Sequence, residues 1–397
     1  MNTAIITPTV ESQRATEESV LALLNSCADV STVLLGRPLH ASYLAKGLRG
    51  LSRGYITLDA SKSWLVYWVV HSQALLGLKI TPELAERVID TLSRCQNETG
   101  GFGGGPGQMS HLASTYAAVN ALVTIGTKEA YEVVNRSTLY RWMLSLKCSD
   151  GSFRMHTEGE IDVRGSYCAV ACAKLLNLLT PELAENVGEF VAKCQSYEGG
   201  ISSLPGLEAH GGYTFCGTAA LEILNKSHLL DIERLMRWIT FRQMDIEGGF
   251  SGRTNKLVDG CYSTWQGAVF PLLEVIHQRK HLSQDDKNKI VSLFSRERLQ
   301  EYILICCQDE SGGLRDKPEK GPDYYHTCYC LNGLSAAQHH YRWNTELNDF
   351  EVHETAVCVV GDRSNLLEPT HPVYGVLLEN VAKAIDYFKD APIPTMN

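Results

Sequence analysis

Apolar residues recur along much of the chain with the period of an amphipathic helix, in segments that end at glycine turns. After Thr81 and Pro82, for example, an apolar stripe runs through Leu84, Val88 and Leu92. A threonine cap, a proline in the first turn and a nearby glutamate are the usual signals of a helix start. The pattern therefore predicts a helix that buries one face.

The same start signal, TPELAE, returns 99 residues later at Thr180. An apolar stripe of helical period follows it, formed by Leu183, Val187, Phe190, Val191 and Cys194. We expect one helix over this stretch, ended by the double glycine that follows it, since glycine readily adopts the positive φ of a tight reversal.

A glycine turn is repeated five times along the chain. Its copies are centred near Gly101, Gly151, Gly200, Gly249 and Gly313, at spacings of 50, 49, 49 and 64 residues. The last spacing is stretched by a polar segment at residues 277–288. A fixed period near 50 residues indicates a repeat architecture, in which each copy contributes two helices joined through the turn.

The second helix of each copy carries a tyrosine, which we take as a common register. The five tyrosines are Tyr116, Tyr167, Tyr213, Tyr262 and Tyr329. Three residues before them stand Ala113, Arg164, His210, Asp259 and His326. This register predicts that polar groups gather at one end of a shared cavity. A closed ring fits better than an open solenoid, although periodicity alone does not separate the two.

Composition describes an ordinary globular protein. Of 397 residues, 44% are hydrophobic and 20% charged, and the net charge of -9 argues against a nucleic-acid surface. No apolar run approaches the roughly 20 residues that span a bilayer, and the first residues lack the pattern of a secretory signal, so we expect no transmembrane segment and a cytoplasmic location. The 13 cysteines form no CxxC pair, so most are expected to be small buried residues.

Asp259, Cys261 and His326 form a candidate metal site. Residues two apart diverge by roughly 200° on a regular helix, so Asp259 and Cys261 can act together only at a helix entry. His326 stands in the next copy and becomes their neighbour if adjacent repeats stack. A carboxylate, a thiolate and an imidazole with a fourth position open are typical of catalytic zinc. Alternatively, Asp259 caps a helix, Cys261 packs inside and His326 is a core histidine.

Several dispersed motifs carry a family resemblance. These are DASKSWLVYW, HLASTYAAVNAL, DVRGSYCA, EAHGGYTFCG, GRTNKLVDGCYSTWQ, DKPEK, DYYHTCYCLNGLSAAQ and PTHPVY. From about Leu35 to Tyr374 they resemble the family of protein farnesyltransferase β subunits. The resemblance implies an all-α fold, an α/α toroid of about six helix pairs whose inner helices line a funnel. We expect a helical lead-in over residues 1–49, the toroid over 50–345 and a packed tail over 346–397.

The resemblance also implies site residues. Asp259, Cys261 and His326 match the zinc ligands of the family, with one zinc per subunit. The farnesyl diphosphate site would comprise Trp64, Arg164, Tyr167, His210, Gly211, Gly212, Tyr213, Arg253, Lys256, Tyr262 and Trp265. The peptide site would comprise Ser61, Trp64, Trp68, His111, Ala113 and Tyr325. Asp316 matches an aspartate linked to magnesium, although a surface-loop carboxylate is an equally simple interpretation.

The implied reaction is farnesyl transfer. A zinc-bound thiolate of the substrate cysteine attacks C1 of farnesyl diphosphate, while Lys256, Arg253, His210, Tyr262 and magnesium stabilise the leaving pyrophosphate. Acceptors would be proteins that end in a CaaX motif, such as small GTPases. The resemblance also implies an obligate heterodimer with a helical-repeat α subunit. Ser114 replaces an expected proline, which leaves the preference for the terminal CaaX residue open.

Other functions remain to be compared with this one. A geranylgeranyltransferase type I β subunit uses a C20 donor, but Trp64, which would form a short pocket floor, and Asp316, where those relatives carry lysine, argue against it. A triterpene cyclase would need a DxDD-like motif, and a complement-type thioester protein a CGEQ-like one; neither occurs. A non-catalytic helical-repeat scaffold would bind no zinc.

Overall fold

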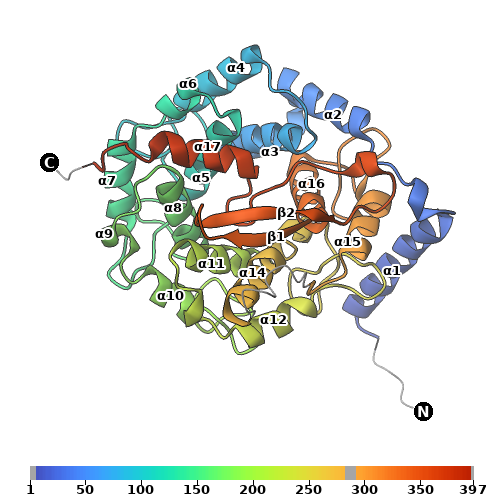
Figure 1. Cartoon of the computed structure of the whole chain (residues 1–397). Helices are drawn as coiled ribbons and strands as arrows, with labels where there is room; N and C mark the ends of the chain where they lie inside the picture. Colours follow the sequence, from blue (N-terminus) through green and yellow to red (C-terminus); the bar gives the residue numbers. More distant parts are fainter. Residues whose placement is uncertain (1–5, 282–291, 395–397) are drawn as a thin grey trace.

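The computed structural model describes residues 6–281 and 292–394, and within these ranges the chain is mostly helical. Figure 1 shows a ring of helices seen end on. The inner wall consists of α3 (Lys62–Leu75), α5 (Leu112–Ile125), α8 (Val163–Leu175), α11 (Gly211–Ile223), α13 (Tyr262–Trp265) with α14 (Val269–His281), and α16 (Tyr324–Gln338). The outer layer consists of α2 (Arg37–Arg49), α4 (Pro82–Ser93), α7 (Arg136–Leu146), α10 (Val187–Lys193), α12 (Ile232–Thr240), and α15 (Arg296–Glu301) with the π-helical turn η5 (Tyr302–Cys307).

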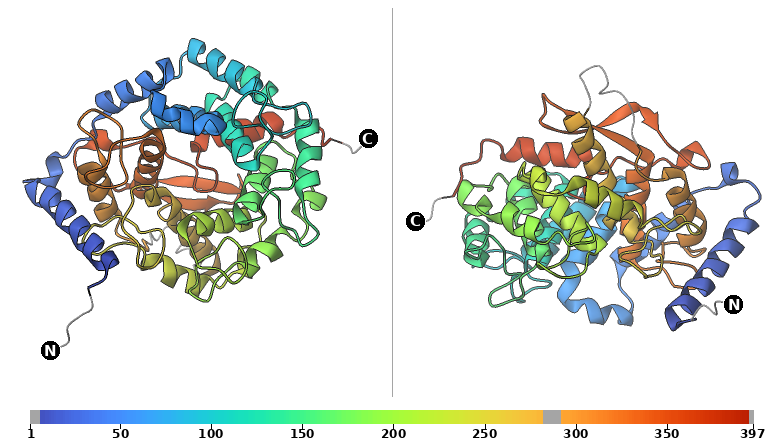
Figure 2. Two further views of the ribbon diagram at one scale, coloured as in Figure 1. Left: turned by 180° about the vertical axis from the view of Figure 1, so that it is seen from behind. Right: turned by 90° about the horizontal axis from the view of Figure 1, so that it is seen from below.

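Successive inner helices pack side by side around the ring. Each contacts the next, from α3 to α5, α8, α11, α13 and α16, and α16 returns to contact α3. This last contact closes the ring and excludes an open solenoid. The prediction of an all-α toroid with about six helix pairs is therefore confirmed. The helix α1 (Pro8–Ser26) lies outside the ring against η5 (Figure 2).

Each glycine turn brings an outer helix of the next repeat close to the backbone. Gly100 and Gly101 have φ values of 103° and 74°, and a Cβ on Gly100 would lie 2.2 Å from the carbonyl oxygen of Thr138 in α7. A side chain would push α7 away from the turn. Steric contact between repeats therefore explains why this turn recurs with glycine.

The tyrosine register that the sequence suggested is wrong for the metal group. The backbone N–H of Asp259 donates to the carbonyl of Phe250 (3.1 Å), and that of Asp323 donates in the same way to Leu314 (3.3 Å). Both aspartates stand nine residues after the bridged residue of their turn. Asp259 thus corresponds to Asp323, and His326 lies three residues further on. Tyr262 stands three residues after Asp259, whereas Tyr329 stands six residues after Asp323, so the two tyrosines are about one helical turn out of register.

The helix expected after Thr180 is broken into two. Thr180 does cap a helix, accepting the N–H of Leu183 at 3.2 Å, but α9 (Pro181–Ala184) stops there and α10 starts at Val187. Between them Asn186 has a φ of 57°. A Cβ on Gly151 of the preceding turn would lie 2.1 Å from the Asn186 carbonyl oxygen. The break therefore lets that turn pack closely, an effect of neighbouring repeats that the apolar stripe does not contain.

One end of the ring is covered by the last part of the described chain. The antiparallel hairpin of β1 (His339–Asn344) and β2 (Asp349–Val357) lies across this end, beside α17 (Leu378–Phe388) (Figures 1 and 2). The sequence pattern had not predicted these strands. The polar segment that stretches the last repeat spacing lies partly in residues 282–288, outside the described residues. None of the described helices is long and apolar enough to cross a membrane.

Residues 373–375 follow the hairpin and accept hydrogen bonds from the inner helices at this end of the ring. Three tyrosine hydroxyls from successive inner helices donate to three consecutive carbonyls there. The pairs are Tyr167 to Val373 (2.7 Å), Tyr116 to Tyr374 (2.8 Å) and Tyr67 to Gly375 (2.6 Å). We call this region the closed end. The N-termini of the inner helices point to the opposite end, which we call the rim.

Candidate functional site

Asp259, Cys261 and His326 meet at the rim. Each offers one donor atom, and these atoms lie within 4.8 Å of one another. Asp259 and Cys261 precede α13, and the Asp259 carboxylate accepts the N–H of Cys261 at 2.8 Å. Between them the N–H of Gly260 donates to the carbonyl of Asp316 at 2.6 Å. The turn before α13 is thus held from both sides, and it places the carboxylate and the thiol together.

His326 is oriented by Asp323, the cap of α16. One Asp323 oxygen accepts the backbone N–H of His326 (2.7 Å), and the other lies 2.6 Å from its Nδ1. A carboxylate accepts only, so Nδ1 carries a proton, and in the neutral ring Nε2 keeps its lone pair. Nε2 is buried without a hydrogen-bond partner, 3.3 Å from an Asp259 oxygen. A histidine held in this way by a carboxylate is a typical metal ligand.

The electrostatics of the group favour a bound cation. Burial raises the pKa of Cys261 to about 12. Burial alone would lower the pKa of His326, but the Asp259 and Asp323 carboxylates and the Cys261 sulfur beside the ring outweigh it and raise that pKa to about 12. The pKa of Asp259 is lowered in spite of burial, because His326 stabilises its charge. These donors therefore attract a proton, and a metal ion could replace it.

A second cluster, His111, His156 and Glu160, has a similar spacing, but its His111 is held in the opposite tautomer to His326. Nδ1 of His111 accepts the N–H of Ala113 at 3.1 Å as the cap of α5. In the neutral ring the proton must then sit on Nε2, which leaves that atom no lone pair for a metal. The contrast with His326 identifies the Asp259 group as the candidate metal centre.

A cavity of about 610 Å³ opens beside this group. It is lined by Arg164, Ser203, Leu207, Glu208, His210, Gly212, Tyr213, Cys216, Arg253, Tyr262, Trp265 and Tyr325. Nδ1 of His210 accepts the N–H of Gly212 (3.1 Å), so its Nε2–H donates to the Tyr262 oxygen (3.0 Å). The Tyr262 hydroxyl proton is then free to donate into the cavity. Burial raises the pKa of Tyr262, which keeps this proton in place.

Aromatic rings continue from this cavity toward the closed end. Trp265 donates its indole N–H to the Tyr325 hydroxyl at 3.1 Å. The ring of Tyr325 lies 5.5 Å from that of Trp68, and Trp68 lies 5.7 Å from Trp64. Trp64 in turn lies 5.8 Å from Tyr116, whose hydroxyl is bound at the closed end. The path forms an apolar wall that ends on Trp64.

The predicted donor-site residues fall into two sets. Those that line the cavity are Arg164, His210, Gly212, Tyr213, Arg253, Tyr262 and Trp265. The others lie around it: Gly211 is packed against Gln266, Tyr167 and Trp64 lie deeper, and Lys256 is exposed on the turn after Arg253.

The predicted peptide and magnesium residues are more dispersed. Tyr325 lines the cavity and Trp68 packs against it. Ser61 precedes α3, and His111 and Ala113 lie at the start of α5. The Asp316 carboxylate is paired with the Lys317 ammonium, so the structure does not bring it into the cavity lining, although its carbonyl touches the metal turn.

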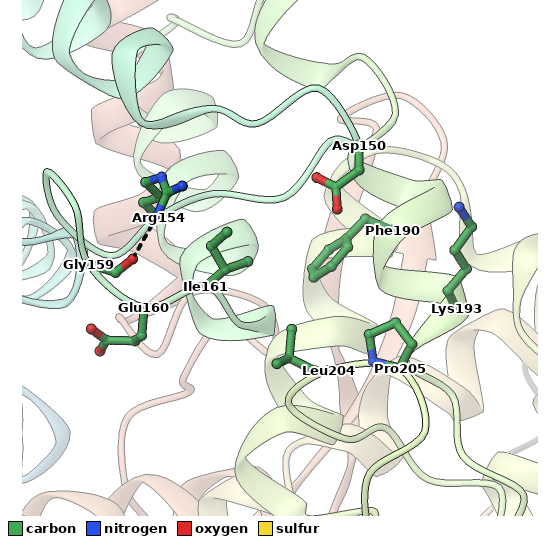
Figure 3. A pocket seen from close by; sticks show the side chains of 9 residues that line it. All are labelled: Asp150, Arg154, Gly159, Glu160, Ile161, Phe190, Lys193, Leu204 and Pro205. Carbon is green, nitrogen blue, oxygen red and sulfur yellow. Dashed lines mark hydrogen bonds between the residues drawn. The ribbon is translucent and has the colours of Figure 1, made fainter.

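Sequence reasoning missed four lining residues, Ser203, Leu207, Glu208 and Cys216. Glu208 had a usable signal, since it stands two residues before His210 in the EAHGGY motif. Residues 203–208 also form a partition. On their other side lies a groove of about 540 Å³ whose apolar residues are Ile161, Phe190, Leu204 and Pro205 (Figure 3).

The chain is similar to known proteins along most of its length. Residues 35–376 match the model of the prenyltransferase alpha-alpha toroid domain. The chain is 43% identical over 378 residues to the protein farnesyltransferase subunit beta of Pisum sativum, covering 82% of this chain and 89% of the relative. It is 42% identical over 365 residues to that of Schizosaccharomyces pombe, covering 92% of each. The solved structure of Candida albicans protein geranylgeranyltransferase-I complexed with GGPP shares the fold, with a TM-score of 0.70 at 21% identity over 89% of this chain and 99% of that one.

Proposed function

The chain belongs to the family of protein farnesyltransferase β subunits, and we propose that it transfers a farnesyl group to the cysteine of proteins that end in a CaaX motif. The observation that carries this proposal is a three-donor metal group at the rim of a cavity that has both a cationic part and an aromatic wall. A thiol, an anionic leaving group and an apolar chain would each find a matching surface there. Small GTPases are one class of protein with such an ending.

We further propose that Asp259, Cys261 and His326 hold one zinc ion. The donor set and the unpartnered Nε2 of His326 fit it. Zinc, when bound, lowers the pKa of a substrate thiol, so that thiolate is present near neutral pH. Asp323 keeps the imidazole in the ligating tautomer, and the Asp259 carboxylate is kept in place by the Cys261 N–H.

The diphosphate would lie among the polar residues of the cavity. Arg253 supplies a full positive charge, and Tyr262 donates its hydroxyl proton to the oxygen that becomes negative as the carbon–oxygen bond breaks. His210 keeps Tyr262 in that donor state through their 3.0 Å hydrogen bond. Arg164, which is paired with Asp162, also lines the cavity, and Lys256 follows Arg253 by three residues on an exposed turn, so we propose that both contribute to the diphosphate site. Gly211 and Gly212 would start α11, whose positive end faces the same anion.

We also propose that magnesium binds beside the diphosphate. Asp316 would contribute to a magnesium site beside the diphosphate only if its carboxylate left Lys317, with which it is paired. Its position next to the metal turn, where its carbonyl accepts from Gly260 at 2.6 Å, supports the assignment.

The C15 chain would pack on the aromatic wall, with Tyr213, Trp265 and Tyr167 along it and Trp64 as its floor. The peptide would contact Ser61, Trp64, Trp68, His111, Ala113 and Tyr325. We propose that the active form is a heterodimer with a farnesyltransferase α subunit. The proposed division is a lead-in (1–49), a toroid (50–345) and a tail (346–397), except that α2 (Arg37–Arg49) of the lead-in already belongs to the outer layer of the ring.

The test is a side-by-side assay of the purified heterodimer with C15 and C20 diphosphates and one CaaX peptide. We expect transfer from the C15 donor to be preferred and one zinc per heterodimer by metal analysis. Preference for the C20 donor would instead indicate a geranylgeranyltransferase type I. Folded protein with neither zinc nor transfer would support the non-catalytic scaffold. The Cys261→Ala heterodimer is the matched control for activity that does not depend on the metal group.

A further inference from the structure

Glu208 brings a negative charge into the cationic part of the cavity. Its Oε2 lies 2.5 Å from Nη1 of Arg253, and both side chains line the cavity with His210 and Tyr262. Among the described residues of this lining, Glu208 is the one acidic side chain. The proposed function gives Arg253 a diphosphate as its ligand. The carboxylate therefore occupies a position on the guanidinium that a phosphate oxygen would take, since both bind arginine with the same geometry.

The surrounding backbone does not depend on this ion pair. The Glu198 carboxylate holds the same two segments together from another side. One of its oxygens accepts the N–H of Ala209 at 3.2 Å, and the other accepts the Thr254 hydroxyl at 3.2 Å. Residues 208–210 and 253–254 are thus joined whether or not Glu208 contacts Arg253. The Glu208 side chain is free to leave without unfolding its loop.

The ion pair is weak enough to be exchanged. The Arg253 and Glu208 side chains are 40% and 48% exposed, and ion pairs at such sites stabilise proteins only slightly. A diphosphate carries more charge and would also bind His210 and Tyr262, so it can displace the carboxylate. Once displaced, Glu208 remains close to the bound anion and repels it.

We propose that Glu208 is a built-in competitor for the diphosphate: it holds Arg253 while the site is empty and returns to Arg253 as pyrophosphate leaves. This inference rests on the proposed function, because it takes the diphosphate to be the ligand of Arg253. Glu208 touches the arginine and no reacting atom, so it acts as a positioning residue. Its effect is to weaken the binding of donor and product by a similar factor and to speed product release.

The experiment compares Glu208→Gln with the unchanged heterodimer. Gln keeps the size of the side chain and removes its charge. We expect Glu208→Gln to bind inorganic pyrophosphate roughly two- to five-fold more tightly than the unchanged heterodimer, because one exposed ion pair contributes on this scale. Calorimetry and product inhibition by pyrophosphate both measure this affinity. Glu208→Asp keeps the charge, so its affinity for pyrophosphate should remain close to that of the unchanged protein. Glu98→Gln, on an exposed turn without a role in the site, controls for net charge.

A double variant tests whether the effect runs through Arg253. In an Arg253→Gln background, the Glu208→Gln change should tighten pyrophosphate binding less than it does alone. An equal gain in both backgrounds, or unchanged or weaker pyrophosphate binding in Glu208→Gln, would overturn the inference. None of these outcomes would contradict farnesyl transfer by the unchanged heterodimer. If the unchanged heterodimer binds neither pyrophosphate nor prenyl diphosphate, the proposed function itself fails, and the inference fails with it.

Discussion

The closed end and the rim of the toroid use their buried side chains differently. At the closed end, the hydroxyls of Tyr67, Tyr116 and Tyr167 each find a carbonyl acceptor in residues 373–375. At the rim, Nε2 of His326 is buried without a hydrogen-bond partner. An unpaired buried polar atom is costly in free energy, and the Asp259 carboxylate and the Cys261 thiol beside this one make a metal ion a fitting ligand. The difference separates the part of the ring that packs from the part that we propose binds the metal.

Loss of one of the three metal-donor side chains at the rim should produce the largest effect on zinc binding and transfer. Cys261→Ala removes one of three protein donors, so we expect zinc affinity to fall more than about 100-fold, beyond the effect usual for outer-shell residues. Thiol transfer should fall with it, whereas farnesyl diphosphate binding and the thermal midpoint should change little. Metal analysis, single-turnover transfer and calorimetry measure the three quantities. Retention of stoichiometric zinc would show that Cys261 is not a ligand.

Asp323→Asn tests the orientation of His326. Asparagine can still cap α16, but it lacks the charge that fixes the proton on Nδ1 of His326. We expect zinc affinity to fall roughly 10- to 30-fold, within the range of second-layer substitutions. Competition with a chelator measures this change. Asp362→Asn, which alters a similar cap at an exposed turn outside the site, is the control; an equal loss there would contradict the assignment.

Trp64→Thr tests whether Trp64 forms the floor of the cavity, where the aromatic path approaches the closed end. The ring of Trp64 lies against Tyr67, Trp68 and Tyr116, so its removal opens space at the end of the aromatic path. We expect the ratio of kcat/KM values for C20 and C15 donors to rise roughly ten-fold, since apolar pocket contacts discriminate on this scale. Zinc content should not change. An unaltered ratio would remove Trp64 as the pocket floor.

Tyr67→Phe should have the smallest effect on chemistry and act on stability instead. The Tyr67 ring stays, but the Gly375 carbonyl loses its 2.6 Å hydrogen bond inside the core. We expect a loss of about 1–2 kcal/mol in the free energy of unfolding, measured by denaturant titration of the heterodimer. Zinc affinity should stay within two-fold. A large loss of zinc would mean that the two ends are coupled, against the separation drawn above.

The sequence predicted the helices from local signals and the closed ring from the family resemblance, and it named three residues whose donor atoms the structure brings together. The repeated turns and caps mark helices, and three chemically suited residues fall in strong motifs. The register of those residues was misjudged, since tyrosines such as Tyr262 and Tyr329 need not occupy equivalent turns. The break at Asn186 depends on Gly151 of another repeat. Glu208 was overlooked because its importance arises from Arg253, 45 residues away.

The closed end also determines when during synthesis the ring can be completed. Tyr67 and its acceptor Gly375 are 308 residues apart. At ordinary rates of protein synthesis, the Tyr67 hydroxyl waits roughly 15 to 60 s before its partner leaves the ribosome. During that time α3 also lacks α16, which closes the ring. The apolar face of α3, which is synthesised first among the inner helices, is therefore exposed for the longest time. Assembly of this toroid should depend on chaperones more than its final stability would suggest.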